Sequence, residues 1–420
     1  MCRGNSNHRL LATISEKTST TMSRKSAFLA RSVAHRTVSF IESEVEQILA
    51  SSQFLQDHEP RADITTLSIE DLELGNFVGR GAFSEVYRLD TIEDDSEHDI
   101  CFSDSDEEPS PRVSQLSLLS QESGLVVKHL RKDLLSNRQR FQSAAADLVR
   151  EAQYLSRLDH AHIIQLRGWA EISALSSGEH DSFFLVMDQL DCTLADKIQG
   201  WKEEEAADSR ISHLETKLRY ARELASALEY LHQHRLVFRD LKPENIGILD
   251  DSIVLFDFGL IRELPASECL EEQFEMSGVG TLGYMAPETL STRKYNQQAD
   301  VYSFSMVLYE LLFHKKPFEM YTLDMYRLFV CEEEQRPKIP SFCPPHLQSL
   351  LQDAWDAEPS DRPCFHTIRR NLISSPKSRL ASFLEASQNR LKQSFSFGAS
   401  DRTSTTMEDS SIGSWFVGTA

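Results

Sequence analysis

The stretch that decides the fold is FRDLKPEN, residues 238–245. It places a carboxylate (Asp240), an ammonium group (Lys242) and an amide (Asn245) in one short loop. Phosphoryl transfer makes modest covalent demands on a protein, so it requires an acceptor for the hydroxyl proton, a cation and a metal ligand. These three side chains are therefore the candidate catalytic residues, and Asn245 is also a candidate metal ligand.

Two further motifs follow on the C-terminal side. The first is DFG, residues 257–259, which stands behind an apolar strand expected at 253–256. In that place Asp257 can hold Mg²⁺ against the β- and γ-phosphates of a nucleotide. The second is GTLGYMAPE, residues 280–288, which completes the set.

A glycine turn precedes these motifs, in VGRGAFSEV at residues 78–86. Its two glycines allow a strand turn to bring backbone N–H groups close to phosphate. Taken alone, such a turn is more often a plain hairpin. The candidate nucleotide contacts in this stretch are Val78, Gly79, Gly81 and Val86.

A lysine, Lys128, lies in an apolar strand expected at 125–130. A lysine in this position is usually a surface residue whose stem alone is buried. Glu151, on a helix expected at 140–158, favours a buried position for Lys128 instead, because a buried lysine needs a carboxylate partner. A lysine held in this way can grip the α- and β-phosphates.

In order and spacing, these motifs resemble the eukaryotic protein kinase family over residues 72–372. The resemblance implies an α+β, bilobal fold with a small β-rich N-lobe and a larger helical C-lobe. Two strands are expected at 72–90 and a nearly all-apolar helix at 298–313; outside this ordered part, residues 40–54 have the apolar spacing of one short helix. The order of the expected elements in the ordered part, strands first and helices later, favours the same class. The resemblance also implies ATP as the phosphoryl donor, Mg²⁺ as the cofactor and proteins as substrates.

On the nucleotide side, the resemblance implies that Lys128 pairs with Glu151 and contacts ATP. Met187 lies at the gatekeeper position beside the adenine. The hinge, from Asp188 to Leu190, is expected to bond the adenine through its backbone.

On the transfer side, the resemblance implies that Asp240 orients the substrate hydroxyl and that Lys242 neutralises the γ-phosphate. Asn245 and Asp257 are implied to hold Mg²⁺.

The expected acceptor is serine or threonine, because Lys242 and Thr281 are similar to the residues of Ser/Thr kinases at these positions. Residues 162–169 and 278–288 are most similar to the tyrosine-kinase-like branch of these enzymes. Dual specificity is the next alternative. A pseudokinase that binds nucleotide and partners without turnover stays open, because a fold does not by itself guarantee an activity. A kinase for lipids or small molecules is disfavoured by the complete 280–288 segment.

Phe238 stands where the family usually has histidine. Its side chain belongs to a stack that links the lobes, here with Leu155, Leu166 and Phe258. Phenylalanine fills such a position without the hydrogen bonds of an imidazole, so we predict that activity is retained.

Gly247 falls where the family usually has a large apolar residue beneath the adenine, and Val126 replaces the usual alanine above it. We predict a volume swap across the nucleotide, in which the larger roof partly fills the space left by the smaller floor.

Ser277 lies where the family often carries an activating phosphate, so an upstream kinase is a candidate partner. Arg239 and Arg262 are expected to pair with that phosphate. Glu288 and Arg362 resemble a buried, structural ion pair of the family's helical lobe.

Composition excludes several classes of protein. The formal net charge of -21 argues against nucleic-acid binding through a broad basic surface. No apolar run is long enough for a membrane span. The seven cysteines include no close pair typical of metal sites, which indicates free thiols rather than zinc or disulfides.

We divide the chain into a basic, mostly disordered arm (1–63), a kinase domain (64–375) with an acidic disordered insert (91–123), and a Ser-rich disordered tail (376–420). A cytoplasmic location is expected, or an organellar one if residues 1–40 are a transit peptide. The sequence leaves the oligomeric state open.

Overall fold

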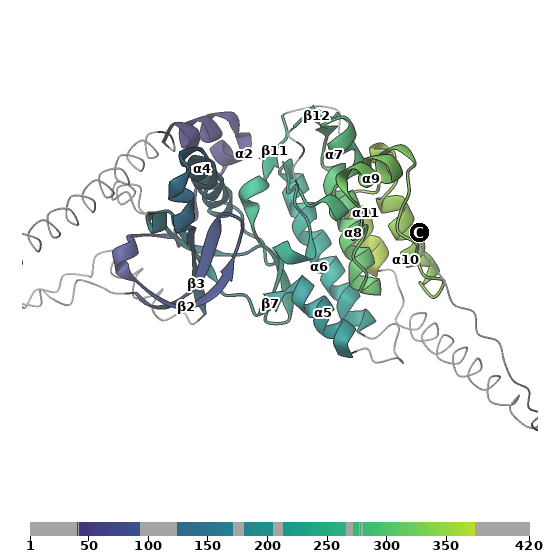
Figure 1. Cartoon of the computed structure of the whole chain (residues 1–420), viewed down its shortest axis with the longest axis horizontal. Helices are drawn as coiled ribbons and strands as arrows, with labels where there is room; N and C mark the ends of the chain where they lie inside the picture. The colour runs from purple at the N-terminus through teal and green to yellow at the C-terminus, as the bar shows by residue number, and fades with distance from the viewer. Residues whose placement is uncertain are drawn as a thin grey trace, which may run out of the picture.

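The structure is a computed structural model, in which two lobes lie side by side, one built on a sheet and one on helices (Figure 1). This arrangement confirms the predicted α+β, bilobal class. The residues that it describes are Phe40, 42–92, 124–170, 180–204, 213–265, 272–276, 278 and 280–373. The predictions for residues 1–39, for most of the insert, for Ser277 and for the tail lie outside these residues. No helix within the described part of the chain is long and apolar enough to cross a membrane.

The N-lobe sheet has six strands in the order β1-β5-β6-β4-β3-β2. Its strands are β1 (Thr65–Leu67), β2 (Leu72–Arg80), β3 (Ser84–Ile92), β4 (Leu125–Leu130), β5 (Leu166–Ala170) and β6 (Phe184–Asp188). All neighbours pair antiparallel except β1, which runs parallel to β5. The expected strands at 72–90 and 125–130 are present, and the insert follows β3.

Strand β1 was not predicted, and Gly168 on β5 gives it room. A Cβ atom at Gly168 would lie 2.7 Å from Leu67 Cδ1 and 3.0 Å from the carbonyl oxygen of Thr65. Any larger residue at 168 would therefore push β1 away from the sheet.

The folded part of the chain begins before the expected boundary at residue 64. Residues 42–51 are helical, and a short helix, α2 (Gln53–Asp57), follows. The expected helical spacing between residues 40 and 54 is correct, but its apolar face is packed: Ile48, Phe54 and Leu55 are buried in the main core. This part of the predicted arm therefore packs onto the core, because these side chains remove apolar area from water when they dock.

Helix α4 (Arg138–Leu155) packs against the N-lobe sheet (Figure 1). Asn137 caps its first turn by accepting a hydrogen bond from the backbone N–H of Arg140. Its buried face includes Phe141, Leu148 and Leu155, at the spacing that the sequence predicts.

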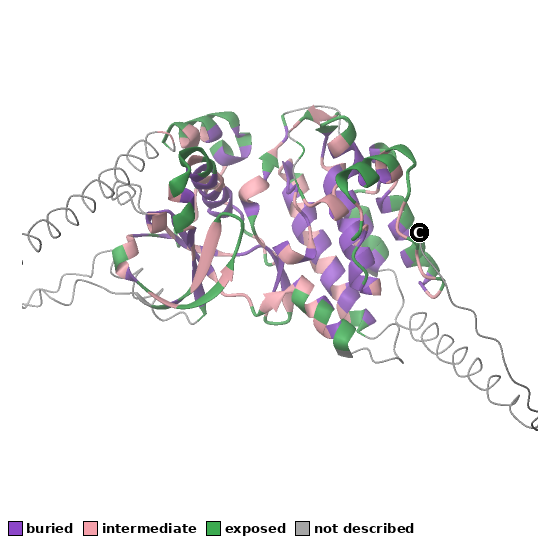
Figure 2. Ribbon diagram, in the orientation of Figure 1, coloured by how far each residue is buried: buried purple, intermediate pink, exposed green. Residues whose placement is uncertain are grey.

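The C-lobe is mainly helical, and α8 (Gln298–Phe313) lies at its centre, buried along almost its whole length (Figure 2). A helix that is apolar on all sides is expected to be buried in this way. The other helices are α5 (Leu194–Glu204), α6 (Leu214–Gln233), α7 (Pro287–Ser291), α9 (Leu323–Met325), α10 (Pro345–Ala354) and α11 (Phe365–Ile373), with a π-helical turn at Tyr326–Glu332.

Three small sheets complete the C-lobe. The first contains β7 (Cys192–Thr193), β9 (Ile246–Leu249) and β10 (Ser252–Leu255). The second pairs β8 (Leu236–Val237) with β11 (Arg262–Glu263), and the third pairs β12 (Phe274–Glu275) with β13 (Lys294–Tyr295).

Candidate active site

The catalytic-loop residues form one hydrogen-bonded group around Asp240. Lys242 Nζ donates to Asp240 Oδ2 at 2.6 Å, and Asn245 Nδ2 donates to the same oxygen at 3.1 Å. The hydroxyl of Thr281 donates to Asp240 Oδ1 at 2.9 Å and accepts from Lys242 Nζ at 3.1 Å. The structure therefore brings together the three predicted catalytic residues and fixes the Asp240 carboxylate on both oxygens.

Gly280 allows the segment at 280–288 to approach this loop closely. It has φ +121°, and a Cβ atom there would lie 2.8 Å from the carbonyl oxygen of Arg239. A side chain would be strained and would clash, so glycine is required beside Thr281.

Asp300, a buried aspartate on α8, anchors the catalytic loop from below. Its carboxylate accepts hydrogen bonds from the backbone N–H groups of Phe238 (2.8 Å) and Arg239 (2.9 Å), and it contacts His232 Nε2 at 3.1 Å. Asp300 was not predicted from the sequence. The available signal was an aspartate inside a mostly apolar helix, because a buried charge requires partners.

Lys128 is held between two carboxylates at the junction of the lobes. Its Nζ donates to both oxygens of Glu151 (2.9 and 2.7 Å) and to Asp257 Oδ1 at 3.0 Å. Burial alone would lower the pKa of Lys128, but the charges of Asp257 and Glu151 outweigh it and raise that pKa. The same lysine lowers the pKa of Asp257. Lys128 and Asp257 are therefore both charged at neutral pH.

The four side chains of the predicted stack between the lobes, Leu155, Leu166, Phe258 and Phe238, are all buried in the main core. The rings of Phe238 and Phe258 meet edge to face with centroids 5.2 Å apart. Phenylalanine thus occupies the expected position in the stack through ring packing alone.

The residues available to a divalent cation fit Mg²⁺. Asn245 Nδ2 also donates to the Asp240 carbonyl oxygen at 2.9 Å, so its Oδ1 is the atom that it can offer to a metal. Asp257 has φ +66°, and its side chain is 47 % exposed. No group of three or more potential ligands exists within the described residues. Mg²⁺ takes one or two protein ligands and completes its shell with phosphates and water, so this donor set suits it.

The glycine turn joins β2 and β3 at the open edge of the N-lobe. Gly79 pairs with Val86, and the Gly81 N–H donates to the Ser84 carbonyl oxygen at 2.8 Å. Val78 is half exposed. The four predicted nucleotide contacts of this stretch lie on the two strands and their turn.

The hinge is tied to both lobes. The N–H of Gln189 donates to the Gly124 carbonyl oxygen at 2.6 Å, and the N–H of Asp191 donates to the Ile248 carbonyl oxygen at 2.8 Å. Leu190 lies between these two bonds. Before it, Met187 is buried at the end of β6, opposite Val126 and Leu166.

The Asp188 side chain faces a neighbouring strand. Arg167 donates to its two carboxylate oxygens at 2.7 and 3.3 Å. This leaves the backbone of the hinge, rather than the Asp188 carboxylate, as the group that can address a nucleotide.

The floor beneath the adenine position departs from the sequence prediction. A Cβ atom at Gly247 would lie 2.5 Å from Leu190 Cδ1, 2.7 Å from Cδ2 and 3.0 Å from Cγ. The space that a floor side chain would need is therefore filled by the hinge residue Leu190, and not by Val126 as predicted. The prediction was wrong because it considered only residues on opposite sides of the nucleotide.

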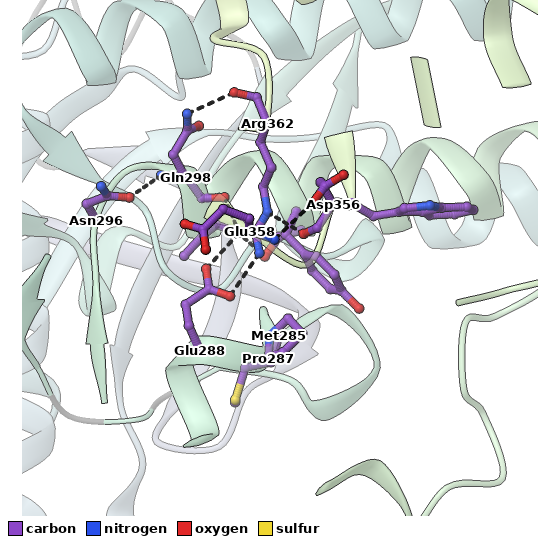
Figure 3. Close-up of polar contacts among 12 residues, drawn as sticks. Met285, Pro287, Glu288, Asn296, Gln298, Asp356, Glu358 and Arg362 are labelled. Carbon is purple, nitrogen blue, oxygen red and sulfur yellow. Dashed lines mark hydrogen bonds and ion pairs between the residues drawn. The ribbon is translucent and has the colours of Figure 1, made fainter. Parts of the chain in front are cut away.

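The expected ion pair between Glu288 and Arg362 supports the C-lobe (Figure 3). Arg362 donates to the two carboxylate oxygens of Glu288 at 2.7 and 2.9 Å, and its side chain is 0 % exposed. It also donates to the carbonyl oxygens of Gln298 and Asp356, both at 2.9 Å. The pair joins α7 to the segment before α11, away from the reacting groups.

Comparisons with known proteins agree with this geometry. A sequence profile of the protein kinase domain matches residues 111–372, which begin after the glycine turn and include Lys128, Asp240 and Asp257. The dual specificity protein kinase shkC of Dictyostelium discoideum is 38% identical over 157 residues, 36% of this chain and 30% of that protein.

Two relatives from Arabidopsis thaliana are similar. The serine/threonine/tyrosine-protein kinase HT1 is 38% identical over 158 residues, 37% of this chain and 39% of that protein. The serine/threonine-protein kinase STY17 is 33% identical over 156 residues, 37% of this chain and 26% of that protein. The chain therefore spans well under half the length of these relatives.

Proposed function

The chain belongs to the protein kinase family, and from this we propose that it transfers the γ-phosphoryl group of ATP to serine or threonine hydroxyls of proteins. The observation that carries the proposal is the hydrogen-bonded group of Asp240, Lys242, Thr281 and Asn245, facing Lys128 and Asp257 across the junction of the lobes. A pseudokinase is disfavoured because each of the charged groups that transfer requires is present and paired.

The chain's own residues supply positioning and charge. Asp240 accepts the proton of the substrate hydroxyl as the acceptor oxygen bonds to the γ-phosphorus. The bond from that phosphorus to the β–γ bridging oxygen breaks, and ADP leaves with the electron pair. Lys242 lies beside Asp240 and offsets the charge of the transferring group.

Lys128, oriented by Glu151, binds the α- and β-phosphates of ATP. Asn245 and Asp257 would hold Mg²⁺, which supplies charge neutralisation at the β- and γ-phosphates when it is bound. The Leu190 backbone, between two fixed hinge bonds, would hold the adenine.

Transfer to tyrosine as well is the second candidate. It is supported by the names of the relatives, which include a dual specificity kinase and a serine/threonine/tyrosine kinase. Serine and threonine are favoured because Lys242 and Thr281, which hydrogen-bond to each other at 3.1 Å, are similar to the residues of Ser/Thr kinases at these positions.

An activating phosphate at Ser277, added by an upstream kinase, is part of the proposal. Its support is a cluster of arginines: Arg150 on α4, Arg239 in the catalytic loop and Arg262 on β11. Burial, then the charges of Arg150 and Arg239, lower the pKa of Arg262, so positive charge is concentrated there. A phosphate dianion beside them would relieve this repulsion.

The test is transfer from γ-³²P-ATP with Mg²⁺ to a generic basic protein, comparing wild type with Asp240→Asn. The variant should lose activity by about 10²–10⁴-fold, because it loses the proton acceptor. Acid hydrolysis of the product assigns the phosphate to serine, threonine or tyrosine. Ser277→Ala in the same panel, with phosphate occupancy measured by mass spectrometry, tests activation.

Equal activity in wild type and Asp240→Asn would contradict the catalytic role. No transfer by wild type, with full Ser277 phosphorylation and ATP bound, would support the pseudokinase alternative.

A further inference from the structure

Residues 42–63 form a segment that we call the N-terminal strap. It consists of the helical turns at 42–51, helix α2 and the extended residues that lead to β1. Ile48, Ser52, Phe54 and Leu55 are its buried residues. Figure 1 shows α2 beside α4, on the side of the molecule where β11 enters the C-lobe.

The strap first contacts the C-terminal end of α4. The ring of Phe54 stacks on Tyr154 with centroids 6.0 Å apart. The N–H of Arg61 donates to the Ser156 carbonyl oxygen at 2.8 Å, and Arg157 Nε donates to the His58 carbonyl oxygen at 2.7 Å. These contacts flank Leu155, the member of the interlobe stack that α4 contributes.

The strap then reaches the next member of the stack. Arg61 Nη2 donates to the Leu166 carbonyl oxygen at 2.7 Å, and Nη1 donates to Gln165 Oε1. One arginine of the strap therefore bonds to the chain on both sides of the N-lobe half of the stack, at Ser156 and at Leu166.

Its third contact is with the C-lobe, at Glu263 on β11. Both oxygens of Glu263 accept from the N–H of Phe54, at 3.1 and 3.2 Å, and one accepts from the hydroxyl of Ser52. The ring of Phe54 also meets His234 edge to face at 5.1 Å. His234 caps the end of α6, so a single aromatic side chain contacts both lobes.

Glu263 leads directly to the rest of the stack. It pairs with Leu236 in the β8–β11 ladder, and Arg262 pairs with Val237, which precedes Phe238. Strand β11 itself follows the DFG turn that contains Phe258. The strap therefore bonds to the residue after Leu155, to Leu166 itself, and to the β11 residue that pairs with Leu236, two positions before Phe238.

We propose that the N-terminal strap is a positioning element for phosphoryl transfer, which fixes α4 and β11 relative to each other. In this position α4 keeps Glu151 hydrogen-bonded to Lys128, and β11 keeps the DFG turn in place, so that Asp257 also contacts Lys128. The proposal rests on the proposed kinase activity and adds to it the segment that sets the active geometry. A plainer role, in which the strap only covers apolar surface, would stabilise both lobes without changing turnover per folded molecule.

The two roles are separated by substitutions at Phe54. Phe54→Ala removes the ring contacts with Tyr154 and His234, and Phe54→Leu restores much of the buried volume. Gln53→Ala is the matched control, because Gln53 is exposed on the same helix and its side chain bonds to Asp57 within that helix. Full-length chains are compared by kcat, by KM for ATP and for a peptide, and by hydrogen exchange along α4 and α8.

We expect Phe54→Ala to lower kcat by about tenfold or more, a change of about 1.4 kcal/mol in activation free energy, with KM for the peptide unchanged. The amides of α4 should exchange faster, and those of α8 should not. Phe54→Leu should recover most of the kcat, and Gln53→Ala should equal wild type.

The proposal is overturned if Phe54→Ala and Gln53→Ala have equal kcat and equal exchange in α4. It is also overturned if exchange rises equally in α4 and α8 while turnover per folded molecule stays normal. That result is the one expected of a strap that only covers apolar surface. Absence of transfer by wild type would contradict the proposed function instead, and the exchange comparison would still decide whether the strap holds α4.

Discussion

At the scale of single residues, Gly247 and Leu190 share one packing site on the floor of the nucleotide pocket. Their backbones belong to different elements, β9 and the hinge, but only one of them can carry a side chain into this space. The hinge supplies that side chain, so the shape of the floor depends on a residue whose backbone is also expected to bond the adenine.

This packing predicts a coupled pair of substitutions. Gly247→Leu alone should weaken ATP binding and lower stability by about 1–3 kcal/mol, because its Cβ atom would overlap Leu190. Leu190→Ala alone should weaken ATP binding by opening the floor. The double variant should recover much of the loss, with a coupling energy of about 0.5–3 kcal/mol.

The measurements are KM for ATP and the increase in melting temperature on adding ATP. The same cycle with Val126→Ala in place of Leu190→Ala serves as the control and should be additive. Additivity in the Leu190 cycle would show that the two residues do not share a site.

The sequence predicted polar side chains that the structure brings together, but not the packing around them. Asp240, Lys242, Asn245, Lys128, Glu151 and Asp257 could be proposed because their order and spacing match the motifs of the kinase family. The position of the Leu190 side chain could not, because it depends on a rotamer chosen among neighbours from two lobes. The role of Asp300 required knowing which backbone groups lie beneath α8.

At the scale of elements, an ion pair joins α7 to the segment before α11. It is buried, and both Glu288 oxygens are used. Removal of one partner leaves the other charge buried without compensation.

Arg362→Ala should therefore lower the free energy of unfolding by about 3–5 kcal/mol. Lys316→Ala provides the control, because its pair with Glu244 at 3.1 Å is exposed and should contribute about 0–1 kcal/mol. Urea unfolding followed by fluorescence measures both. A loss of stability as small as that of the control would show that water reaches Glu288 in the variant.

Helices were predicted from sequence better than short strands. The expected helix at 298–313 agrees with α8 at both ends, because its apolar composition and length leave few alternatives. Strand β1 has three residues and no alternation to detect, and it exists because Gly168 leaves space for it. The docking of the strap depends on Glu263, which no local pattern around residue 52 can indicate.

At the scale of the whole molecule, contacts between the lobes also set the response to acid. His160, in the turn after α4, stacks on Tyr230 of α6 at 5.2 Å and contacts Ser226 Oγ at 3.3 Å. Its Nδ1 accepts a hydrogen bond from the backbone N–H of His162 at 3.1 Å. Protonation of Nδ1 would therefore place two N–H donors against each other. Burial first, and then the charges of His162 and Arg369, lower the pKa of His160 to about 4.

This shift predicts a loss of stability in mild acid. Between pH 6.5 and 4 the unfolded chain binds a proton at this position and the folded chain does not, so the free energy of unfolding falls as pH falls. Above the unfolded pKa of about 6.5 the free energy of unfolding keeps its full value. The loss on acidification amounts to at most about 3 kcal/mol, and to less after solvent screening.

The measurement compares urea unfolding of wild type and His160→Gln at pH 7.5 and 5.5. The variant should lose less free energy of unfolding between the two values than wild type. Equal losses would mean that other groups account for the acid response.

The strap has a final consequence, which concerns the order in which the chain is made. Ser52 and its acceptor Glu263 are separated by 211 positions. At about 5–20 residues per second, a ribosome completes the binding site for the strap roughly 10–40 s after the strap itself. The strap therefore emerges among the first folded residues, but it cannot dock fully until β11 has been made.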